Sequence, residues 1–378
     1  MELHEARQYV IDAGKRLASA GLIARTWGNV SCRISDDQFV ITPSGRAYDT
    51  LEPADIVIVN IADLSYEGSI KPSSEKGVHA EVYKQRPWIH FVIHTHQDNA
   101  SIAAVLGCGV DIANEDTRRL IGEKVELAAY GLPGTGKLRK GVSDALKISR
   151  SKAILMAHHG TVCMGATPDE AFAVAIALEK ECKRFLAQPQ PVNMPPLHSS
   201  RREGDSFVLE TLHGAIAFTL EPGSVDAAAA LHADAALHRA IYLARPDIRV
   251  IKASGLPALV DVSAHAVTVK PLLDDFAQLI GTSLRCADWD EGAPIVNARR
   301  VVQALQGCNA VLIRGRGALC CAGNASDAEA VEMVLDKGCK AYLAAAASGR
   351  IKPISPLECK LMRYIYLKKY SKMDQSNK

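Results

Sequence analysis

The stretches Lys71-Pro72-Ser73-Ser74-Glu75-Lys76-Gly77-Val78-His79 and Phe91-Val92-Ile93-His94-Thr95-His96 carry most of the chemistry that this sequence offers. The second is an apolar run that ends in two histidines two positions apart. Side chains at i and i+2 of a strand leave the same face, so His94 and His96 can bind one metal ion. A catalytic zinc site usually has three protein ligands and one open position. We therefore expect a third ligand from elsewhere in the chain.

The best candidate for the third ligand is His159, which follows a second strand-like apolar run, Ala153-Ile154-Leu155-Met156, and precedes a glycine. His158 is the first alternative, although it leaves the other face of the strand if the strand is regular to its end. Upstream, Glu75 follows two serines on a turn that begins at Pro72. A carboxylate at this place can act as a general base beside a metal ion.

Each of these patterns also has a purely structural interpretation. A His-x-His pair is often two hydrogen-bonded polar residues, and adjacent histidines can simply cap a strand. Pro-Ser-Ser-Glu can begin an ordinary helix, with a serine as the N-cap. The occurrence of all the patterns together favours a metal site with a neighbouring carboxylate.

These patterns resemble the class II aldolase/adducin family. The resemblance covers residues 1–187 and rests on Trp27-Gly28-Asn29-Val30-Ser31, Ile41-Thr42-Pro43-Ser44-Gly45, Lys71-Pro72-Ser73-Ser74-Glu75, His79-x-x-x-Tyr83, Arg86-Pro87, His94-x-His96 and His159-Gly160. It implies an α/β fold in which a three-layer α/β/α domain contains a central, largely antiparallel sheet. It also implies that His94, His96 and His159 bind Zn²⁺, or Mn²⁺ or another divalent metal, and that Glu75 is the catalytic acid/base.

The resemblance further implies a site for the phosphate group of a substrate. The residues that match it are Asn29, Ser44, Gly45, Ser73 and Ser74. Their chemistry agrees, because a glycine lets the backbone approach a ligand closely, and amide N–H groups and hydroxyls suit phosphate oxygens.

The composition of the chain places limits on its class. Its 378 residues are 48% hydrophobic and 23% charged, which is typical of a globular protein of about two domains. A net charge of +2 argues against nucleic-acid or membrane-surface partners, and no apolar run reaches the length of a membrane span. Ten cysteines without Cys-x-x-Cys spacing, and a start without a secretory leader, indicate packed thiols and a cytoplasmic location.

The second half of the chain repeats the first. Residues 188–206 carry four prolines and predict a linker between a catalytic domain, 1–187, and a second domain, 207–378. His238-x-x-x-Tyr242 mirrors His79-x-x-x-Tyr83 at a separation of 159 residues, and Arg316-Gly317 mirrors His159-Gly160 at 157. This regularity predicts a duplicated domain.

The second copy lacks the residues that would hold a metal. Lys252-Ala253-Ser254-Gly255 stands where the first copy has its His-x-His pair, Arg316 replaces His159, and Asp234 falls at the place of Glu75. The early Gly-Asn-Val-Ser and Thr-Pro-Ser-Gly segments also have no obvious counterpart. Arginine and lysine cannot replace neutral imidazoles around a cation, so we expect a degenerate copy without zinc at this place.

The segment from Gly131 to Leu138 nearly matches a phosphate-binding P-loop. That motif needs Ser or Thr at its last position, where the hydroxyl holds Mg²⁺, and this chain has Leu138. The alternative is a glycine-rich turn that leads into a helix.

The leading functional hypothesis is a zinc-dependent lyase, an aldolase that acts on a short phosphorylated sugar or sugar acid. The metal would stabilise an enediolate while Glu75 moves the proton. The alternatives are an epimerase, dehydratase or decarboxylase of the same family, a non-catalytic adducin-like assembly protein, and a nucleotide hydrolase. Family members that act on fuculose phosphate use a tyrosine near Ala113-Asn114-Glu115-Asp116, and its absence here argues against that substrate. The resemblance also implies a homo-oligomer, a dimer of two-domain chains.

Overall fold

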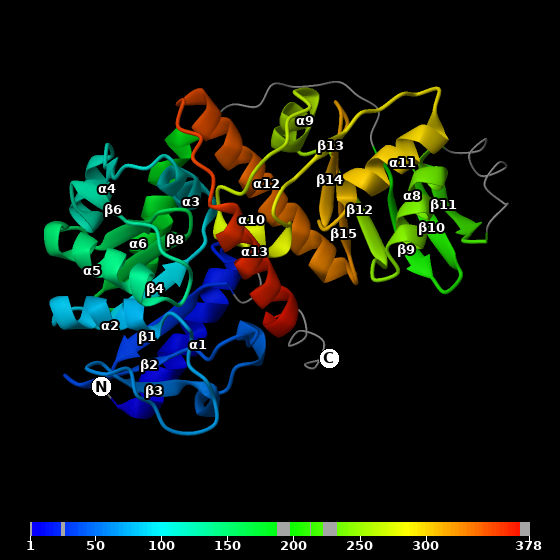
Figure 1. Ribbon diagram of the computed structural model, residues 1–378. Helices are drawn as coiled ribbons and strands as arrows, with labels where there is room; N and C mark the ends of the chain where they lie inside the picture. The colour runs from blue at the N-terminus through cyan, green and yellow to red at the C-terminus, as the bar shows by residue number, and fades with distance from the viewer. Residues whose placement is uncertain (1, 24–26, 187–196, 212, 222–232, 371–378) are drawn as a thin grey trace. The chain divides into compact units, whose positions relative to one another are not determined.

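The computed structural model describes residues 2–23, 27–186, 197–211, 213–221 and 233–370. These residues form two compact units. The first domain comprises residues 2–186 with Ser348–Ile351, and the second comprises residues 197–347 with 352–370. Each domain is built around one β-sheet with helices on both faces (Figure 1).

The elements of the first domain alternate along the chain. Its helices are α1 (Leu3–Ser19), α2 (Lys76–Gln85), α3 (Asp98–Val105), α4 (Glu115–Ile121), α5 (Gly136–Ile148) and α6 (Pro168–Cys182), with short 3-10 helices η1 (Tyr48–Thr50), η2 (Pro53–Asp55) and η3 (Lys183–Phe185). Its strands are β1 (Asn29–Arg33), β2 (Gln38–Ile41), β3 (Val57–Asn60), β4 (Phe91–Thr95), β5 (Val110–Asp111), β6 (Lys124–Ala128), β7 (Ala153–Met156) and β8 (Gly160–Gly165).

The first sheet has the strand order β3-β2-β1-β4-β8-β7-β6-β5. All neighbouring strands are antiparallel except β6 and β7, which are parallel. β4 therefore lies between β1 and β8, and its residues are paired on both sides. His94 is opposite Asn29 on β1 and opposite Val162 on β8.

Two hydrophobic cores cover the two faces of this sheet. Phe91 and Ile93 of β4 belong to the core beneath α1, α3 and α6, whereas Val92 belongs to the core beneath α2 and α5. This alternation places His94 on the face that α2 covers. The predicted three-layer α/β/α architecture with a largely antiparallel sheet is thereby confirmed for the first domain.

The second domain repeats this plan. Its strands are β9 (Ser199–Glu203), β10 (Ser206–Thr211), β11 (Gly214–Thr219), β12 (Val250–Ser254), β13 (Cys286–Ala287), β14 (Ala310–Ile313) and β15 (Gly317–Ala322). Its helices are α8 (Ala233–Ala244), α9 (Pro257–Ala264), α10 (Asp274–Leu279), α11 (Pro294–Leu305), α12 (Ala325–Ala347) and α13 (Pro356–Ile365), followed by the π-helical turn η4 (Tyr366–Tyr370).

The second sheet has the order β11-β10-β9-β12-β15-β14-β13, which matches β3-β2-β1-β4-β8-β7-β6 of the first. Its β13 and β14 are parallel, as are β6 and β7. Helices α8 and α11 cover one face, and α9 and α12 contact the other. The prediction of a duplicated domain is confirmed.

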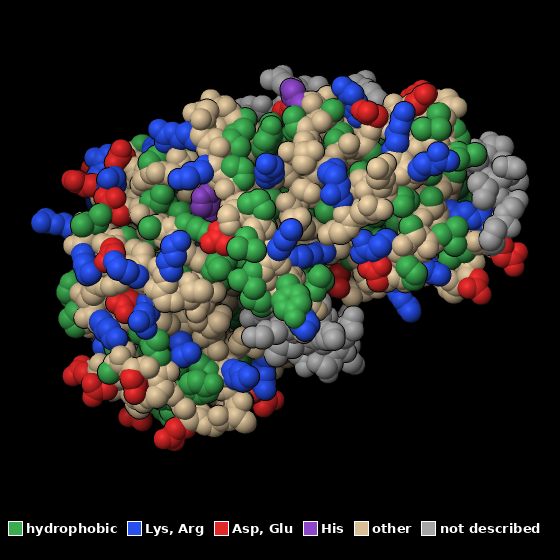
Figure 2. All heavy atoms as spheres, viewed as in Figure 1, with side chains coloured by type: hydrophobic (Ala, Val, Ile, Leu, Met, Phe, Trp, Pro, Cys, Tyr) green, Lys and Arg blue, Asp and Glu red, His purple; other side chains and the backbone are tan. Residues whose placement is uncertain are grey.

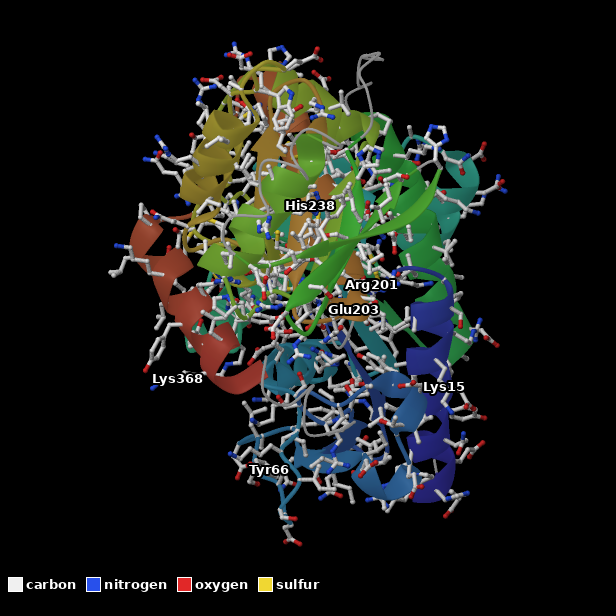
Figure 3. All side chains as sticks on the ribbon, turned by 90° about the vertical axis from the view of Figure 1, so that its right-hand side faces the viewer. Lys15, Tyr66, Arg201, Glu203, His238 and Lys368 are labelled. Atoms are coloured by element: carbon white, nitrogen blue, oxygen red, sulfur yellow. The ribbon has the colours of Figure 1, made fainter. Side chains whose placement is uncertain are left out.

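Residues 188–196 of the predicted linker lie outside the part of the chain that the structure describes, and its C-terminal part, from Ser199 onward, belongs to the second domain. β9 and the first residue of β10 lie inside residues 188–206, and β9 takes the place of β1 between its two neighbours. The composition of this segment predicted a linker because Arg201, Arg202 and Glu203 are charged, and the side chains of Arg201 and Glu203 are exposed (Figure 3). Ser200 is the buried residue of β9, and it is held by polar contacts rather than by an apolar side chain.

Charged side chains of both signs lie on the visible surface (Figure 2). Lys and Arg side chains lie among Asp and Glu side chains on the face seen in Figure 2, rather than in one continuous patch. Among the described helices, none combines the length and the hydropathy needed to cross a bilayer.

Candidate metal centre and acid/base site

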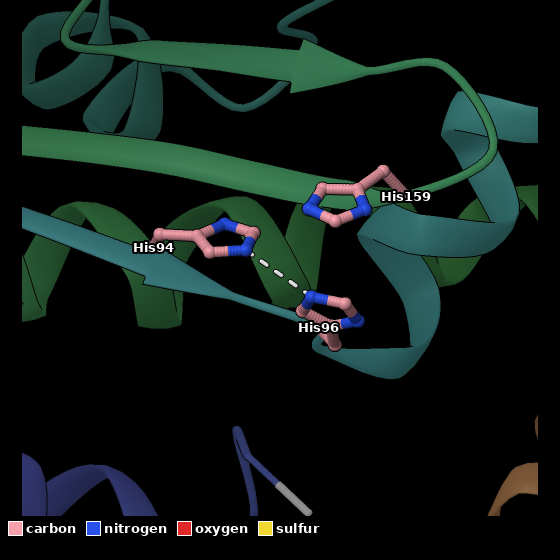
Figure 4. A group of neighbouring side chains, drawn as sticks. All are labelled: His94, His96 and His159. Atoms are coloured by element: carbon pink, nitrogen blue, oxygen red, sulfur yellow. Dashed lines mark hydrogen bonds between the residues drawn. The ribbon is translucent and has the colours of Figure 1, made fainter. Parts of the chain in front are cut away.

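Two of the predicted ligands leave the end of β4 toward α2. His94 and His96 are buried, and their Nε2 atoms lie 3.1 Å apart (Figure 4). In a tetrahedral zinc site with Zn–N distances of 2.0–2.1 Å, two ligand nitrogens lie about 3.3 Å apart. The pair therefore has a spacing that one metal ion can bridge.

The third histidine comes from the turn between β7 and β8. His158 has a positive φ of 61°, an uncommon conformation for a non-glycine residue, and His159 follows it into the site. The residue after His159 must be a glycine, Gly160, because a Cβ atom at this position would lie 2.3 Å from the carbonyl oxygen of Thr95 on β4. This close approach brings the His159 ring to 4.9 Å from the His94 ring and 4.6 Å from the His96 ring.

His94, His96 and His159 form a buried group whose ligand atoms all lie within 4.8 Å of one another. The structure thus brings together the three histidines that the sequence predicted. The alternative ligand, His158, is partly exposed and packs edge-on against the ring of Tyr130.

The hydrogen bonding of His94 fits a metal ligand. Its Nδ1 lies 2.8 Å from the carbonyl oxygen of Thr161, which can only accept, so Nδ1 carries the proton. In the neutral ring Nε2 then presents a lone pair, yet it faces Nε2 of His96 and, at 3.0 Å, Oε2 of Glu75. Positive charge among these atoms would relieve the repulsion between their electron pairs, and three imidazoles beside a carboxylate are a donor set that suits a divalent metal ion.

Glu75 stands at the N-terminus of α2 and is buried. Its Oε1 lies 2.9 Å from Nε2 of His159, and its Oε2 accepts a hydrogen bond of 3.1 Å from Nδ2 of Asn29. Burial alone raises the pKa of this carboxyl group, but His94 and His159 outweigh it and hold the pKa well below its ordinary value. The carboxylate is therefore placed directly against the histidine group.

The residues predicted for a phosphate site come from three segments that hydrogen bonds tie together. The backbone N–H of Ser44 donates to the carbonyl of Lys71, and that of Ser73 donates to the carbonyl of Thr42. Thr42 in turn bonds to Val30, next to Asn29 on β1. Asn29 and Ser73 are buried beside Glu75, whereas Ser44 and Gly45 are half-buried and Ser74 is exposed.

One buried network was not assigned a role by the sequence. Ser31 Oγ lies 2.6 Å from Nδ1 of His79 and 2.7 Å from the hydroxyl of Tyr83, and Nε2 of His79 lies 2.5 Å from Oδ1 of Asn29. Burial, with a smaller contribution from His94, lowers the pKa of His79 to about 3. The signal that pointed to this network was the repeated His-x-x-x-Tyr pattern.

The second domain has a different set of side chains at the equivalent place. Strand pairing aligns Ala253 and Gly255 with His94 and His96, which removes two imidazoles. Asp234 is buried at the place of Glu75, 2.7 Å from Nδ1 of His198 and 3.6 Å from the Arg316 guanidinium. Arg316 also lies over the ring of Trp289, with its Cζ 4.4 Å from the centroid. No other group of metal ligands occurs among the described residues.

The near P-loop is a turn into a helix. Thr135 caps α5 by accepting a hydrogen bond from the N–H of Leu138, and the Leu138 side chain is buried in the core beneath α5. An apolar core side chain at this position cannot bind Mg²⁺.

The comparison with known proteins fits this geometry. The family model "Class II Aldolase and Adducin N-terminal domain" matches residues 8–186 and again residues 204–343. The chain therefore belongs to the class II aldolase/adducin family and carries two copies of its domain.

The relatives named as aldolases match about half of the chain. A 5-methylthioribulose-1-phosphate/5-deoxyribulose-1-phosphate aldolase of Rhodospirillum rubrum is 31% identical over 189 residues, which are 49% of this chain and 84% of that protein. A 5-deoxy-D-ribulose 1-phosphate aldolase of Bacillus thuringiensis serovar kurstaki is 32% identical over 198 residues, covering 52% of this chain and 91% of the relative. A solved L-fuculose 1-phosphate aldolase is 29% identical with a TM-score of 0.45, covering 48% and 84% of the two chains.

Proposed function

We propose that this protein is a metal-dependent lyase that cleaves or forms a carbon–carbon bond in a short ketose 1-phosphate. His94, His96 and His159 would hold Zn²⁺ or a similar divalent ion, and Glu75 would act as the acid/base. The observation that carries the proposal is the buried carboxylate of Glu75, whose two oxygens lie 2.9 and 3.0 Å from nitrogens of two histidines of the group. A base and three neutral ligands at one point are the parts that this chemistry needs.

In the direction of synthesis, Glu75 removes a proton from the carbon beside the carbonyl of a dihydroxyacetone-phosphate-like unit. The electron pair of that C–H bond moves toward the carbonyl oxygen, and the resulting enediolate carbon bonds to an aldehyde whose oxygen takes up a proton. A divalent cation, when bound, supplies positive charge that stabilises the oxygen on which negative charge develops. In cleavage the steps reverse, and Glu75 returns the proton to carbon.

The substrate class follows from the phosphate residues and the relatives. Asn29 and Ser73 lie beside Glu75, and Ser44 is tied to the same segment through Lys71. Together with Gly45 and Ser74 these residues carry amide and hydroxyl groups that suit a phosphate group. Two relatives above 30% identity are named as aldolases of 5-deoxyribulose 1-phosphate. We therefore place 5-deoxyketose 1-phosphates first among the candidate substrates.

The test is a product analysis with zinc-loaded and manganese-loaded protein. We expect 5-deoxyribulose 1-phosphate, or a close ketose 1-phosphate, to give dihydroxyacetone phosphate and a short aldehyde. The unphosphorylated ketose is the control and should react far more slowly. An epimer, a dehydrated product or carbon dioxide would overturn the aldolase assignment in favour of another chemistry of the family.

We also propose that the chain works as a homo-oligomer, a dimer of two-domain chains in the cytoplasm, in which the second domain supports the activity of the first. A chain that ends at Gln188 keeps the three histidines and Glu75 but lacks the second copy. It should lose most activity or change its assembly state in light scattering. A shortened chain with full activity and an unchanged assembly state would contradict the supporting role.

A further inference from the structure

A buried chain of hydrogen bonds leads from Tyr83 to Glu75. It runs from the Tyr83 hydroxyl to Ser31 Oγ (2.7 Å), to His79 Nδ1 (2.6 Å), from His79 Nε2 to Asn29 Oδ1 (2.5 Å), and from Asn29 Nδ2 to Glu75 Oε2 (3.1 Å). All five residues are buried, and they come from β1 and from the start and body of α2.

Each hydrogen bond in this chain has a fixed direction. The carboxylate of Glu75 can only accept, so the Asn29 amide must present its NH₂ group to it and its Oδ1 to His79. Oδ1 can only accept, so Nε2 of His79 carries the proton. Burial keeps this ring neutral, so Nδ1 accepts a hydrogen bond from the hydroxyl of Ser31.

The far end of the chain has a donor that keeps its proton. Burial raises the pKa of the Tyr83 hydroxyl well above its ordinary value, so this group donates to Ser31 Oγ. The donors therefore point one way, from Tyr83 through Ser31, His79 and Asn29 to Glu75. A network in which every member is satisfied holds one arrangement rather than several.

We propose that Tyr83, Ser31 and His79 are positioning residues that fix the orientation of the Asn29 amide and, through it, the carboxylate of Glu75. The inference rests on the proposed acid/base role of Glu75. Its consequence is that Asn29 keeps one N–H on Glu75 and has its second N–H available for the substrate. A flipped amide would instead turn its oxygen toward the carboxylate, which repels it.

The second domain provides a control for a purely structural role. Ser200 Oγ lies 2.6 Å from Nδ1 of His238 and 2.8 Å from the hydroxyl of Tyr242, so the same three side chains meet in the same way. The next residue of the hydrogen-bonded chain differs between the two domains, because His198 stands at the place of Asn29 and contacts Asp234. His238 lies inside the second domain (Figure 3), with the Ser–His–Tyr contact but without a catalytic carboxylate at its end.

The experiment compares His79 and His238 variants of the full-length, zinc-loaded protein. In His79→Asn the shorter side chain can still put an amide atom at the position of Nδ1, beside Ser31, but it does not reach Asn29. In His79→Gln the longer side chain can put an amide NH₂ group at the position of Nε2–H, beside Asn29. We expect His79→Asn to lower kcat roughly 10- to 100-fold, because a small displacement of a catalytic group is enough for such a loss. His79→Gln should recover most of it. KM should rise in His79→Asn, because Asn29 then loses the orientation that offers its second N–H to the substrate. His238→Asn should leave kcat and KM unchanged, and metal content should stay constant in all three.

A second readout does not depend on turnover. The ¹³C signal of the Glu75 carboxyl carbon, identified by its absence in Glu75→Gln, should shift in His79→Asn and stay in place in His238→Asn. The ¹⁵N signals of His79 should show a neutral ring protonated at Nε2. An unmoved Glu75 signal, an Nδ1-protonated His79, or equal losses of kcat in the two Asn variants would overturn the proposal. If the unsubstituted protein cleaves no ketose phosphate, the proposed function fails, and the carboxyl signal still decides the positioning role.

Discussion

In the first domain the buried carboxylate of Glu75 meets two imidazoles, those of His94 and His159, whereas in the second domain the carboxylate of Asp234 meets one imidazole and a guanidinium. The two carboxylates stand at the same place in the same fold, yet their charge is balanced differently. A guanidinium is a permanent cation that belongs to the chain. Neutral imidazoles instead leave their lone pairs for a cation that comes from solution.

The comparison teaches that a duplicated fold can keep its buried carboxylate after the metal ligands are gone. Arg316 brings its own positive charge to Asp234, and the guanidinium also lies over the ring of Trp289. In the second site the chain itself therefore supplies the positive charge beside the carboxylate, whereas the first site offers the three histidines that we propose as metal ligands.

The sharpest way to break the comparison is to remove the charge from each carboxylate in turn. Glu75→Gln keeps the size of the side chain but removes the base, so kcat should fall roughly 10²- to 10⁴-fold while the metal content stays constant. Asp234→Asn is the matched variant and should leave kcat unchanged. Steady-state kinetics together with elemental analysis distinguish the two. Equal losses in both variants would mean that the second site takes part in catalysis.

A second prediction concerns stability. Arg316→Met leaves Asp234 buried without its cation, and loss of one partner of a buried pair costs about 3–5 kcal/mol. The partly exposed His198 beside Asp234 should keep the loss at the lower end of this range. Denaturant unfolding of the second domain measures the change. The double variant Asp234→Asn/Arg316→Met should recover most of the lost stability, and a double variant as unstable as Arg316→Met would contradict the pairing.

The smallest expected effect is the contribution of His79 to acid sensitivity. The folded pKa of about 3 lies below the ordinary value of 6.5, so the unfolded chain binds a proton first as the pH falls. The stability from the neutral ring is complete above pH 6.5 and declines as the pH falls from there toward 3. When the pH is lowered from 7 to 5.5, with metal removed by a chelator, the free energy of unfolding of the unsubstituted protein should fall by about 1 kcal/mol more than that of the His79→Gln variant. Equal losses of stability in the unsubstituted protein and in His79→Gln would contradict a lowered pKa of His79.

Much of the first site was predictable because local rules decide it. The period of two in a strand puts His94 and His96 on one face, and the order of motifs marked Glu75 and His159. The choice of His159 over His158 was less secure, since it depends on the positive φ of His158 and on the close approach of Gly160 to β4. These are properties of the strand order, which brings β8 beside β4.

The features that the sequence did not predict depend on contacts between residues far apart in the chain. Ser31 and His79 meet only because β1 lies beside β4 under α2, so the His-x-x-x-Tyr pattern marked His79 and Tyr83 but nothing local marked their contact with Ser31. β9 was taken for a linker because its sequence, Ser-Ser-Arg-Arg-Glu, lacks an apolar alternation. Its pairing with β10 and β12 makes it a strand, and Ser200 is buried through its bonds to His238 and Tyr242.

The central claim is that the first domain binds a metal ion and the second does not, and metal content per chain tests it most directly. We expect about one zinc-like divalent ion per chain, a site that empties in His94→Ala, His96→Ala or His159→Ala, and an unchanged content in Arg316→Ala, since a catalytic metal needs its three protein ligands. A His159→Ala protein that keeps its metal, or two ions in the unsubstituted chain with one lost in Arg316→Ala, would contradict the account.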